Sequence, residues 1–477
     1  MEIVKKFRTV FFYILIIGGF SFLVYWLITQ GKGLEAGRHV IENAATGSSF
    51  QDFFDSFVSN IQHPAGILLL QITIIIVFAR VFGWLFNKIG QPVVVGEIIA
   101  GIVLGPSLLG LYLPEVSEFI FPVKSLANLQ VLSQIGLILF MFIVGMELNL
   151  KVLKTKAHEA VVISHASIII PFAAGIALAY FIYSSFAPDG ISFMSFGLFL
   201  GISMSITAFP VLARIIQERG IHKTKLGAIV ITCAAADDIT AWCLLAAVIA
   251  IVKAGSFVSS IYTILLAVAY VAFMIKIVRP FLKKTAESLK TEKGFKQSAI
   301  AIFFLVLLCS SFVTEIIGIH ALFGAFMAGV IMPSNPRFRS MFIDKIEDVA
   351  LVLLLPLFFV ITGLRTEIGL LNDSYLWIVT GVIILVAVFG KFVGSAVAAK
   401  YVGQSWKDSL TIGTLMNTRG LMELVVLNIG YDLGVLNAEI FAMMVIMALV
   451  TTFMTGPVLN IINRVFKDNT SKAPVSK

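Results

Sequence analysis

Charged residues are scarce in this chain: Asp, Glu, Lys and Arg make up 13% of its 477 residues, against about a quarter in soluble domains. Hydrophobic residues make up 59% of the sequence. The chain also lacks any polar stretch long enough to form a separate soluble domain. These features exclude a water-soluble fold and predict a single membrane domain.

Cysteine is scarcer still, with Cys233, Cys243 and Cys309 as its only occurrences. All three lie within apolar runs, their number is odd, and none belongs to a CxxC pair. This pattern indicates neither a disulfide framework nor a zinc site. We expect the three side chains to be small residues of the protein core, and we expect no bound cofactor.

The formal net charge of +8 would suit a nucleic-acid partner. However, most of the Lys and Arg residues lie in short loops between apolar runs, where the positive-inside rule places them. Membrane topology therefore explains the charge. We expect the chain to be surrounded by the lipid bilayer and to bind no nucleic acid.

Apolar runs long enough to cross a hydrocarbon core of about 30 Å recur along the whole chain, and they predict an all-α membrane protein of about 14 spans. The first run follows a basic N-terminus, as in a signal peptide. It is about 20 residues long and no clear cleavage site follows it, so we expect a retained helix. The runs lie near residues 9–29, 65–84, 92–111, 127–146, 159–186, 190–215, 224–252, 255–279, 295–314, 319–333, 343–363, 373–400, 408–430 and 436–463.

Loops rich in Lys and Arg alternate with loops that are poor in them. Residues 214–225 and 283–296 are examples of the first kind, and 187–190, 314–320 and 431–439 of the second. The alternation predicts that both termini are cytoplasmic. We expect an extra N-terminal helix with an external loop, then the membrane domain, then a cytoplasmic tail, at residues 1–64, 65–464 and 465–477.

Two short motifs occur in the same order in both halves of the chain. GEIIAGIVLGP begins at Gly96 and GAFMAGVIMP at Gly324, and the next span in each half carries a similar run, LFMFIVGMEL at 139–148 and LFFVITGLRT at 357–366. The span count places the two halves in opposite orientations. Packing glycines also recur by chance in membrane proteins, but the matched order favours an inverted repeat, which in many transporters places the binding site at the midplane.

Asp237 and Asp238 lie near the middle of the apolar run at 224–252. Ionisable side chains at this depth are costly, so they normally face a cavity and serve a function. Neighbours on a helix point about 100° apart, so one carboxylate can bind a cation while the other pairs with a basic group. A carboxylate that holds either H⁺ or a small cation is sufficient for exchange, and a purely structural pair is the alternative.

Two spans contain helix breakers at corresponding positions, each the fourth of five spans in its half. The first contains Pro210, with Thr207 available to bond a freed backbone group, and the second contains Asn417, Thr418 and Gly420. A single kink is usually structural. Paired interrupted helices predict a transport site, because half-helix dipoles and freed carbonyls can face the ion.

Three further ionisable residues lie in the second half. Lys391 is well inside the run at 373–400, so it either pairs with a carboxylate, for which Asp237 is the candidate, or extends its ammonium group to the membrane surface. Arg419 and Glu423 are spaced i, i+4 beside the second helix break. They either neutralise each other on one helix face or contribute to the site.

Taken together, these motifs resemble those of the second monovalent cation:proton antiporter family, which includes bacterial Na⁺/H⁺ antiporters, potassium efflux systems and plant cation/H⁺ exchangers. The likeness covers roughly residues 65–464, through the two repeated motifs and through ITAFPVLARII, AAADDITAW and MNTRGLMELVVLNIG. It implies inverted repeats with two crossed broken helices, a core domain and a dimerisation domain. It also implies a homodimer in a cell membrane, which we expect to be a bacterial inner membrane.

The resemblance also implies roles for single residues. Asp238 would bind the cation or the proton, Asp237 would pair with Lys391 and carry a second proton, and Thr207 would help to ligate the ion. The two aspartates would bind only Na⁺ or K⁺ as a metal. The residues expected to support the broken helices are Pro210, Asn417, Thr418, Arg419, Gly420 and Glu423.

The function that follows is exchange of a monovalent cation for protons by alternating access. Within the family, a double Asp with a matching Lys accompanies exchange of more than one proton per cation, so Na⁺ is the first expectation and K⁺ the second. ITAFP and MNTRG look most like the plant exchangers, which often carry Asn-Asp. No nucleotide-binding domain follows the last span, so gated potassium efflux is not expected.

Two other classes are remote alternatives. An intramembrane aspartyl protease also needs two membrane aspartates, but it places them on separate helices in YD and GxGD motifs, and this sequence contains no GxGD. A passive channel has no use for a titratable pair inside an inverted repeat. We therefore expect a transporter and not an enzyme.

Overall fold

The computed structural model describes residues 2–35, 49–147, 157–221, 224–254, 257–288, 290–291, 294–295, 297–333 and 335–470. The contacts divide the chain into two units, Met1–His63 and Pro64–Lys477. The first unit contains α1 (Glu2–Lys32), the short turn η1 (Gly33–Glu35) and α2 (Ser49–Gln62). Much of the predicted external loop lies outside the described residues.

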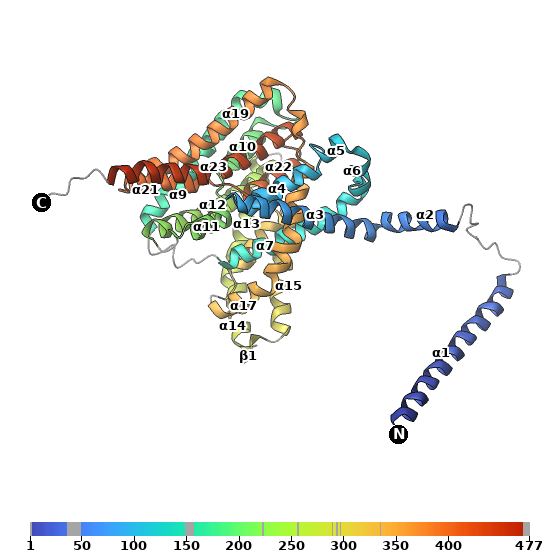
Figure 1. The fold of residues 1–477 in the computed structure, drawn as a ribbon. Helices are drawn as coiled ribbons and strands as arrows, with labels where there is room; N and C mark the ends of the chain where they lie inside the picture. The colour runs from blue at the N-terminus through green and yellow to red at the C-terminus, as the bar shows by residue number, and fades with distance from the viewer. Residues whose placement is uncertain are drawn as a thin grey trace. The chain divides into compact units, whose positions relative to one another are not determined.

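Helices dominate the second unit, and we divide them into two bundles by their packing (Figure 1). In the scaffold bundle, α4 packs on α3 and α18, and α7 packs on α16 and α18. Short helices and one π-helical segment, η4, complete it. Its elements are α3 (Pro64–Lys88), α4 (Val93–Leu104), α5 (Leu109–Tyr112), α6 (Pro114–Ile120), α7 (Val123–Glu147), α15 (Gln297–Ile317), α16 (Ala321–Val330), α17 (Pro336–Glu347), η4 (Asp348–Leu354) and α18 (Leu355–Leu364).

In the site bundle, α9 packs on α10, α12 and α20, and α23 packs on α19, α21 and α22. A π-helical segment, η6, interrupts the long span that joins α19 to α20. The elements are α9 (Ala157–Phe186), α10 (Phe193–Ser205), α11 (Phe209–Glu218), α12 (Lys225–Ala254), α19 (Ser374–Val388), η6 (Phe389–Val393), α20 (Gly394–Tyr401), α21 (Trp406–Met416), α22 (Leu421–Asp432) and α23 (Ala438–Thr470).

The remaining elements connect the bundles. Helix α13 contacts both α12 and α15. A two-residue antiparallel pairing, with Lys290 opposite Phe295, is the only strand pairing among the described residues. These connecting elements are α13 (Phe257–Phe273), η3 (Met274–Val278), α14 (Arg279–Ser288), β1 (Lys290–Thr291), β2 (Gly294–Phe295) and η5 (Ile368–Leu370).

Within the described residues, eleven helices are long and apolar enough to cross a membrane. The prediction of an all-α, polytopic membrane protein is therefore confirmed. The three other predicted spans, 190–215, 319–333 and 408–430, coincide with α10 and α11, with the short helix α16, and with α21 and α22. The count of about 14 stays a prediction.

The repeated motifs meet each other across the scaffold bundle. Gly329 of α16 lies so close to α7 that a Cβ there would be 2.9 Å from the Cα of Gly145. Likewise, a Cβ on Gly101 of α4 would be 2.7 Å from the Cα of Val360 in α18. The first motif of each half thus packs against the second motif of the other half. A repeat related by a twofold axis predicts this reciprocal packing of the motifs. The close approach of the helices explains why the motifs need glycine.

The burial of the three cysteines differs from the prediction. Cys233 is buried, but Cys243 and Cys309 are exposed on the outer surface of their helices. The prediction of three core residues was therefore wrong for two of them. In a membrane protein, an apolar surface position faces lipid, so hydrophobicity does not distinguish such a position from the core.

Candidate cation and proton site

The first broken helix separates α10 from α11 at residues 206–208. Ile206 has extended dihedrals, φ −74° and ψ 137°, and α11 begins at Phe209. Pro210 is therefore the second residue of a new helix, and the break precedes it. Proline is well tolerated in a first helical turn, because the backbone N–H that it lacks has no partner inside the helix.

The second broken helix separates α21 from α22 at residues 417–420. Its break contacts the first one directly, because the Ala208 backbone N–H donates to the Thr418 carbonyl at 3.1 Å. The Thr207 hydroxyl also reaches the Met416 carbonyl at 3.3 Å. The two breaks thus satisfy part of each other's backbone hydrogen bonding, which buried non-helical backbone in a membrane requires.

Asp237 of α12 faces this crossing and accepts three hydrogen bonds from hydroxyl groups. Ser164 donates to Oδ1 at 2.5 Å, and Ser167 and Thr207 donate to Oδ2 at 3.0 and 2.8 Å. The Lys391 ammonium lies 3.7 Å from Oδ2. Both charged side chains are completely buried. Asp237 is therefore satisfied as a carboxylate by groups from α9, the first break and η6.

Asp238 is also completely buried, but its surroundings differ. Neither of its carboxylate oxygens has a hydrogen-bond partner of normal geometry among the described residues. Polar support comes from the Phe209 backbone, at the first residue of α11. A bare buried carboxylate is very costly. Asp238 therefore lacks the compensating donors that surround Asp237.

Lys391 lies in η6, where π-helical hydrogen bonding replaces the regular α-helical pattern. Such segments are rare and frequently occur at functional sites. The ammonium group donates to the Ser205 carbonyl and, at 3.1 Å, to the Ser167 carbonyl. Because the side chain has no exposed surface, the alternative in which it reaches the membrane surface was wrong.

Arg419 and Glu423 form a fully buried ion pair with 3.0 Å between Nη1 and Oε2. Arg419 also donates to the carbonyls of Ser203 and Met204, at 2.8 and 2.7 Å. These carbonyls belong to the last turn of α10, where a cation complements the helix dipole. The pair is therefore more than an i, i+4 neutralisation, because it joins the second break to the end of α10.

The structure brings the predicted residues Asp237, Asp238, Thr207 and Lys391 to one place, beside both breaks. Thr207 donates to Asp237 and not to Asp238. Sequence reasoning missed Ser164 and Ser167. Their i, i+3 spacing on α9 would place them on one helix face, but serine in an apolar helix has many structural uses, so this signal alone is weak.

Known proteins with a similar sequence or fold are membrane exchangers and antiporters. The family model for the transmembrane region of sodium/hydrogen exchangers matches residues 74–464. A solved structure, the sodium proton antiporter MjNhaP1 from Methanocaldococcus jannaschii at pH 8, matches with a TM-score of 0.60. The match covers 82% of this chain and 96% of that one at 14% identity. The fold is therefore that of a membrane antiporter.

Related proteins with similar sequences are also antiporters by name. The Na⁺/H⁺ antiporter NhaS4 of Synechocystis sp. is 43% identical over 82% of this chain and 96% of its own length. Cation/H⁺ antiporter 17 of Arabidopsis thaliana and K⁺/H⁺ antiporter 1 of Saccharomyces cerevisiae are 42% and 32% identical over 84% and 85% of this chain. The match spans about half of the plant and yeast proteins, 48% and 47%. This chain belongs to the sodium/hydrogen exchanger family, and the predicted resemblance is confirmed.

Proposed function

We propose that the protein exchanges a monovalent cation, Na⁺ in the first place, for protons across a membrane, with Asp238 as the site of competition. The observation that carries this proposal is the contrast within the aspartate pair. Asp237 has three hydroxyl donors and an ammonium group, whereas Asp238 is equally buried, has only the Phe209 backbone as polar support, and has no hydrogen-bond partner of normal geometry among the described residues.

The physical basis is the cost of a dry charge. A carboxylate in this environment binds a proton, or it binds a cation whose own dehydration it offsets, and the two occupants exclude each other. Carboxylate and carbonyl oxygens suit hard cations such as Na⁺ and K⁺. Additional oxygen ligands would come from the backbone freed at the two breaks and from Thr207. When the site then faces the other side of the membrane, the second occupant replaces the first.

Asp237 and Lys391 have a different role in this proposal. Their buried charges balance while Asp238 changes its occupant, so the site keeps a defined net charge. If Asp237 takes up a proton when Lys391 moves away, more than one proton crosses per cation. The second break is held by Asn417, Thr418, Arg419, Gly420 and Glu423. Pro210 supports the first break from the first turn of the helix that follows it.

We further propose the arrangement of the protein in the membrane. Both termini lie in the cytoplasm, residues 65–464 form the exchanging domain, and the chain works as a homodimer in a bacterial inner membrane. The alternation of Lys- and Arg-rich loops supports the orientation. The protein acts as a transporter and not as an enzyme, and it needs no cofactor besides the ions that it moves.

Exchange of K⁺ for protons by the same fold is the second candidate. The K⁺/H⁺ antiporter of yeast, 32% identical to this chain, favours it, and the 43% identical Na⁺/H⁺ antiporter of Synechocystis favours Na⁺. Both candidates use the same aspartates. They differ in the size of the oxygen cage around the ion, which backbone carbonyls of any residue can adjust.

Purified protein in liposomes tests the proposal. Imposing Na⁺, K⁺ or Li⁺ on one side should drive protons across for the wild-type chain, with Na⁺ the most effective ion. Asp238→Asn should abolish this movement while the variant remains folded. Glu118→Gln is a matched control, because it removes an exposed carboxylate far along the chain from the site. Undiminished exchange by Asp238→Asn would overturn the site, and cation-independent current would indicate a channel.

A further inference from the structure

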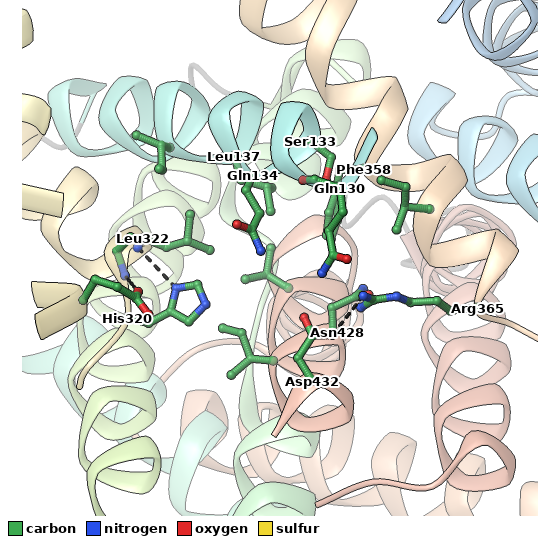
Figure 2. A pocket seen from close by; sticks show the side chains of 16 residues that line it. Gln130, Ser133, Gln134, Leu137, His320, Leu322, Phe358, Arg365, Asn428 and Asp432 are labelled. Carbon is green, nitrogen blue, oxygen red and sulfur yellow. Dashed lines mark hydrogen bonds and ion pairs between the residues drawn. The ribbon is translucent and has the colours of Figure 1, made fainter. Parts of the chain in front are cut away.

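A second polar region lies away from the aspartates, in a cavity of about 310 Å³ between the scaffold bundle and α22. Figure 2 shows Gln130 and Gln134 of α7 on one side of this cavity and Asn428 and Asp432 of α22 on the other. Arg365 follows α18 and extends toward Asn428. None of the residues assigned to the exchange site lines this cavity.

Arg365 bridges the two bundles here. Its Nη1 donates to Asn428 Oδ1 at 2.8 Å, and its Nη2 lies 2.9 Å from Asp432 Oδ1. Asn428 in turn donates to the hydroxyl of Thr362 in α18 at 2.9 Å. A guanidinium group presents its donors in a rigid fork, so two acceptors on successive turns of one helix hold it in a defined orientation.

The bridge acts on the half-helix that carries the second break. Helix α22 runs from the break at Gly420 to Asp432, so the bridge and the break are about 18 Å apart at 1.5 Å per residue. Between them the helix is continuous. A displacement of the site bundle relative to α18 therefore moves the backbone of Asp432 relative to that of Arg365.

The exposure of the pair suits an interaction that breaks repeatedly. The side chains of Arg365 and Asp432 are 19% and 41% exposed, whereas Arg419 and Glu423, near the other end of α22, have no exposed surface. A partly hydrated ion pair is weak, and its separated charges remain solvated. Glu315 lines the same cavity, where its carboxylate accepts a hydrogen bond from the Ala321 backbone N–H at 2.8 Å.

We propose that Arg365 and Asp432 are positioning residues of the exchange cycle: they form a latch between α18 and α22 that is closed in one access state and opens when the site turns to the other side. This inference rests on the proposed function. The loops that follow α15 and α22 lack Lys and Arg, so the latch lies at the external side in the predicted topology.

Cross-linking tests the latch. Arg365→Cys and Asp432→Cys are combined in a chain with Cys233, Cys243 and Cys309 changed to Ala, reconstituted in liposomes, and joined by a reducible thiol-specific cross-linker. The cross-linked protein should lose exchange, and reduction should restore it, because a fixed latch confines the protein to one access state. Full exchange by the cross-linked protein would overturn the latch.

A double-variant cycle provides the second test and avoids the cysteine changes. Arg365→Gln and Asp432→Asn should each change the exchange rate by about two- to fivefold, the range expected for a partly exposed pair. The double variant should match Arg365→Gln alone, because that change already removes the ion pair that Asp432→Asn removes, together with the hydrogen bond to Asn428. Effects that multiply, or that equal those of the control Glu118→Gln, would overturn the latch. Exchange by the wild-type chain tests the proposed function separately.

Discussion

At the scale of single residues, two neighbouring aspartates on one helix have opposite environments. Asp237 faces serine, threonine and lysine donors, and Asp238 faces none at hydrogen-bond geometry among the described residues. The 100° between neighbours on a helix is the origin of this difference, because it turns one side chain toward α9 and η6 and leaves the other beside the first residue of α11. One sequence motif thus places two buried carboxylates in different surroundings, and the proposed function assigns the exchanged ion to Asp238.

The variant Lys391→Ala tests the proposed pairing of the Lys391 ammonium group with the Asp237 carboxylate. Removing the ammonium group leaves Asp237 with its hydroxyl donors but without a counter-charge, so Asp237 should take up a proton in its place. We expect a folded protein with an altered pH profile of exchange and an altered charge moved per cycle. In liposomes, the first is measured as the exchange rate at several pH values and the second from the reversal potential. Lys407→Ala, an exposed lysine, is the control. A wild-type profile and reversal potential for Lys391→Ala would contradict this role.

At the scale of the elements, the crossing depends on Arg419 closing the end of α10. Arg419→Met strands the Glu423 carboxylate and removes donors from two helix-end carbonyls, so it should cost about 3–5 kcal/mol of stability, as for other broken buried pairs. Glu423→Gln keeps an acceptor for Arg419 and should cost less. Thermal unfolding in detergent measures both. Equal melting temperatures for Arg419→Met and the wild type would contradict the contacts described.

The glycine contacts between the repeated motifs make a separate prediction. A methyl group on Gly329 would lie 2.9 Å from the Cα of Gly145, whereas a methyl group on Gly381 of α19 would meet no atom within 4 Å. Gly329→Ala should therefore destabilise the scaffold bundle by about 1–3 kcal/mol, the usual cost of overpacking. Gly381→Ala should be neutral or slightly stabilising, because alanine favours helix. Similar melting temperatures for the two variants would contradict the close approach.

At the scale of the whole molecule, local chemistry in the sequence was enough to predict the apolar spans, the two breaks and the buried aspartates. The spans follow from the length of the apolar runs, and the breaks and the aspartates from residues that are unusual inside such runs, such as Pro210 and Asp237. The hydroxyl donors of Asp237 could not be predicted, because Ser164 and Asp237 are 73 residues apart and meet only through the packing of α9 on α12.

The bridge between Arg365 and Asp432 was missed for a related reason. Both residues lie at helix ends beside loops, where charged side chains are ordinary, so neither is conspicuous in the sequence. Their partnership depends on how the scaffold bundle meets α22, and no local pattern encodes that geometry. The exposed Cys243 and Cys309 show another limit of sequence reasoning, because apolar residues in a membrane protein can face either the core or the bilayer.

The central claim is that H⁺ and the cation compete for one carboxylate, and the pH dependence of cation affinity tests it most directly. Exchange rates in liposomes should be measured as a function of Na⁺ concentration at several pH values on the same side. Competition predicts that the apparent KM for Na⁺ rises by up to about tenfold for each unit that the pH falls, because the proton must leave before Na⁺ binds. The maximal rate at saturating Na⁺ should be retained. An apparent KM that does not depend on pH, with only the maximal rate changing, would contradict the account.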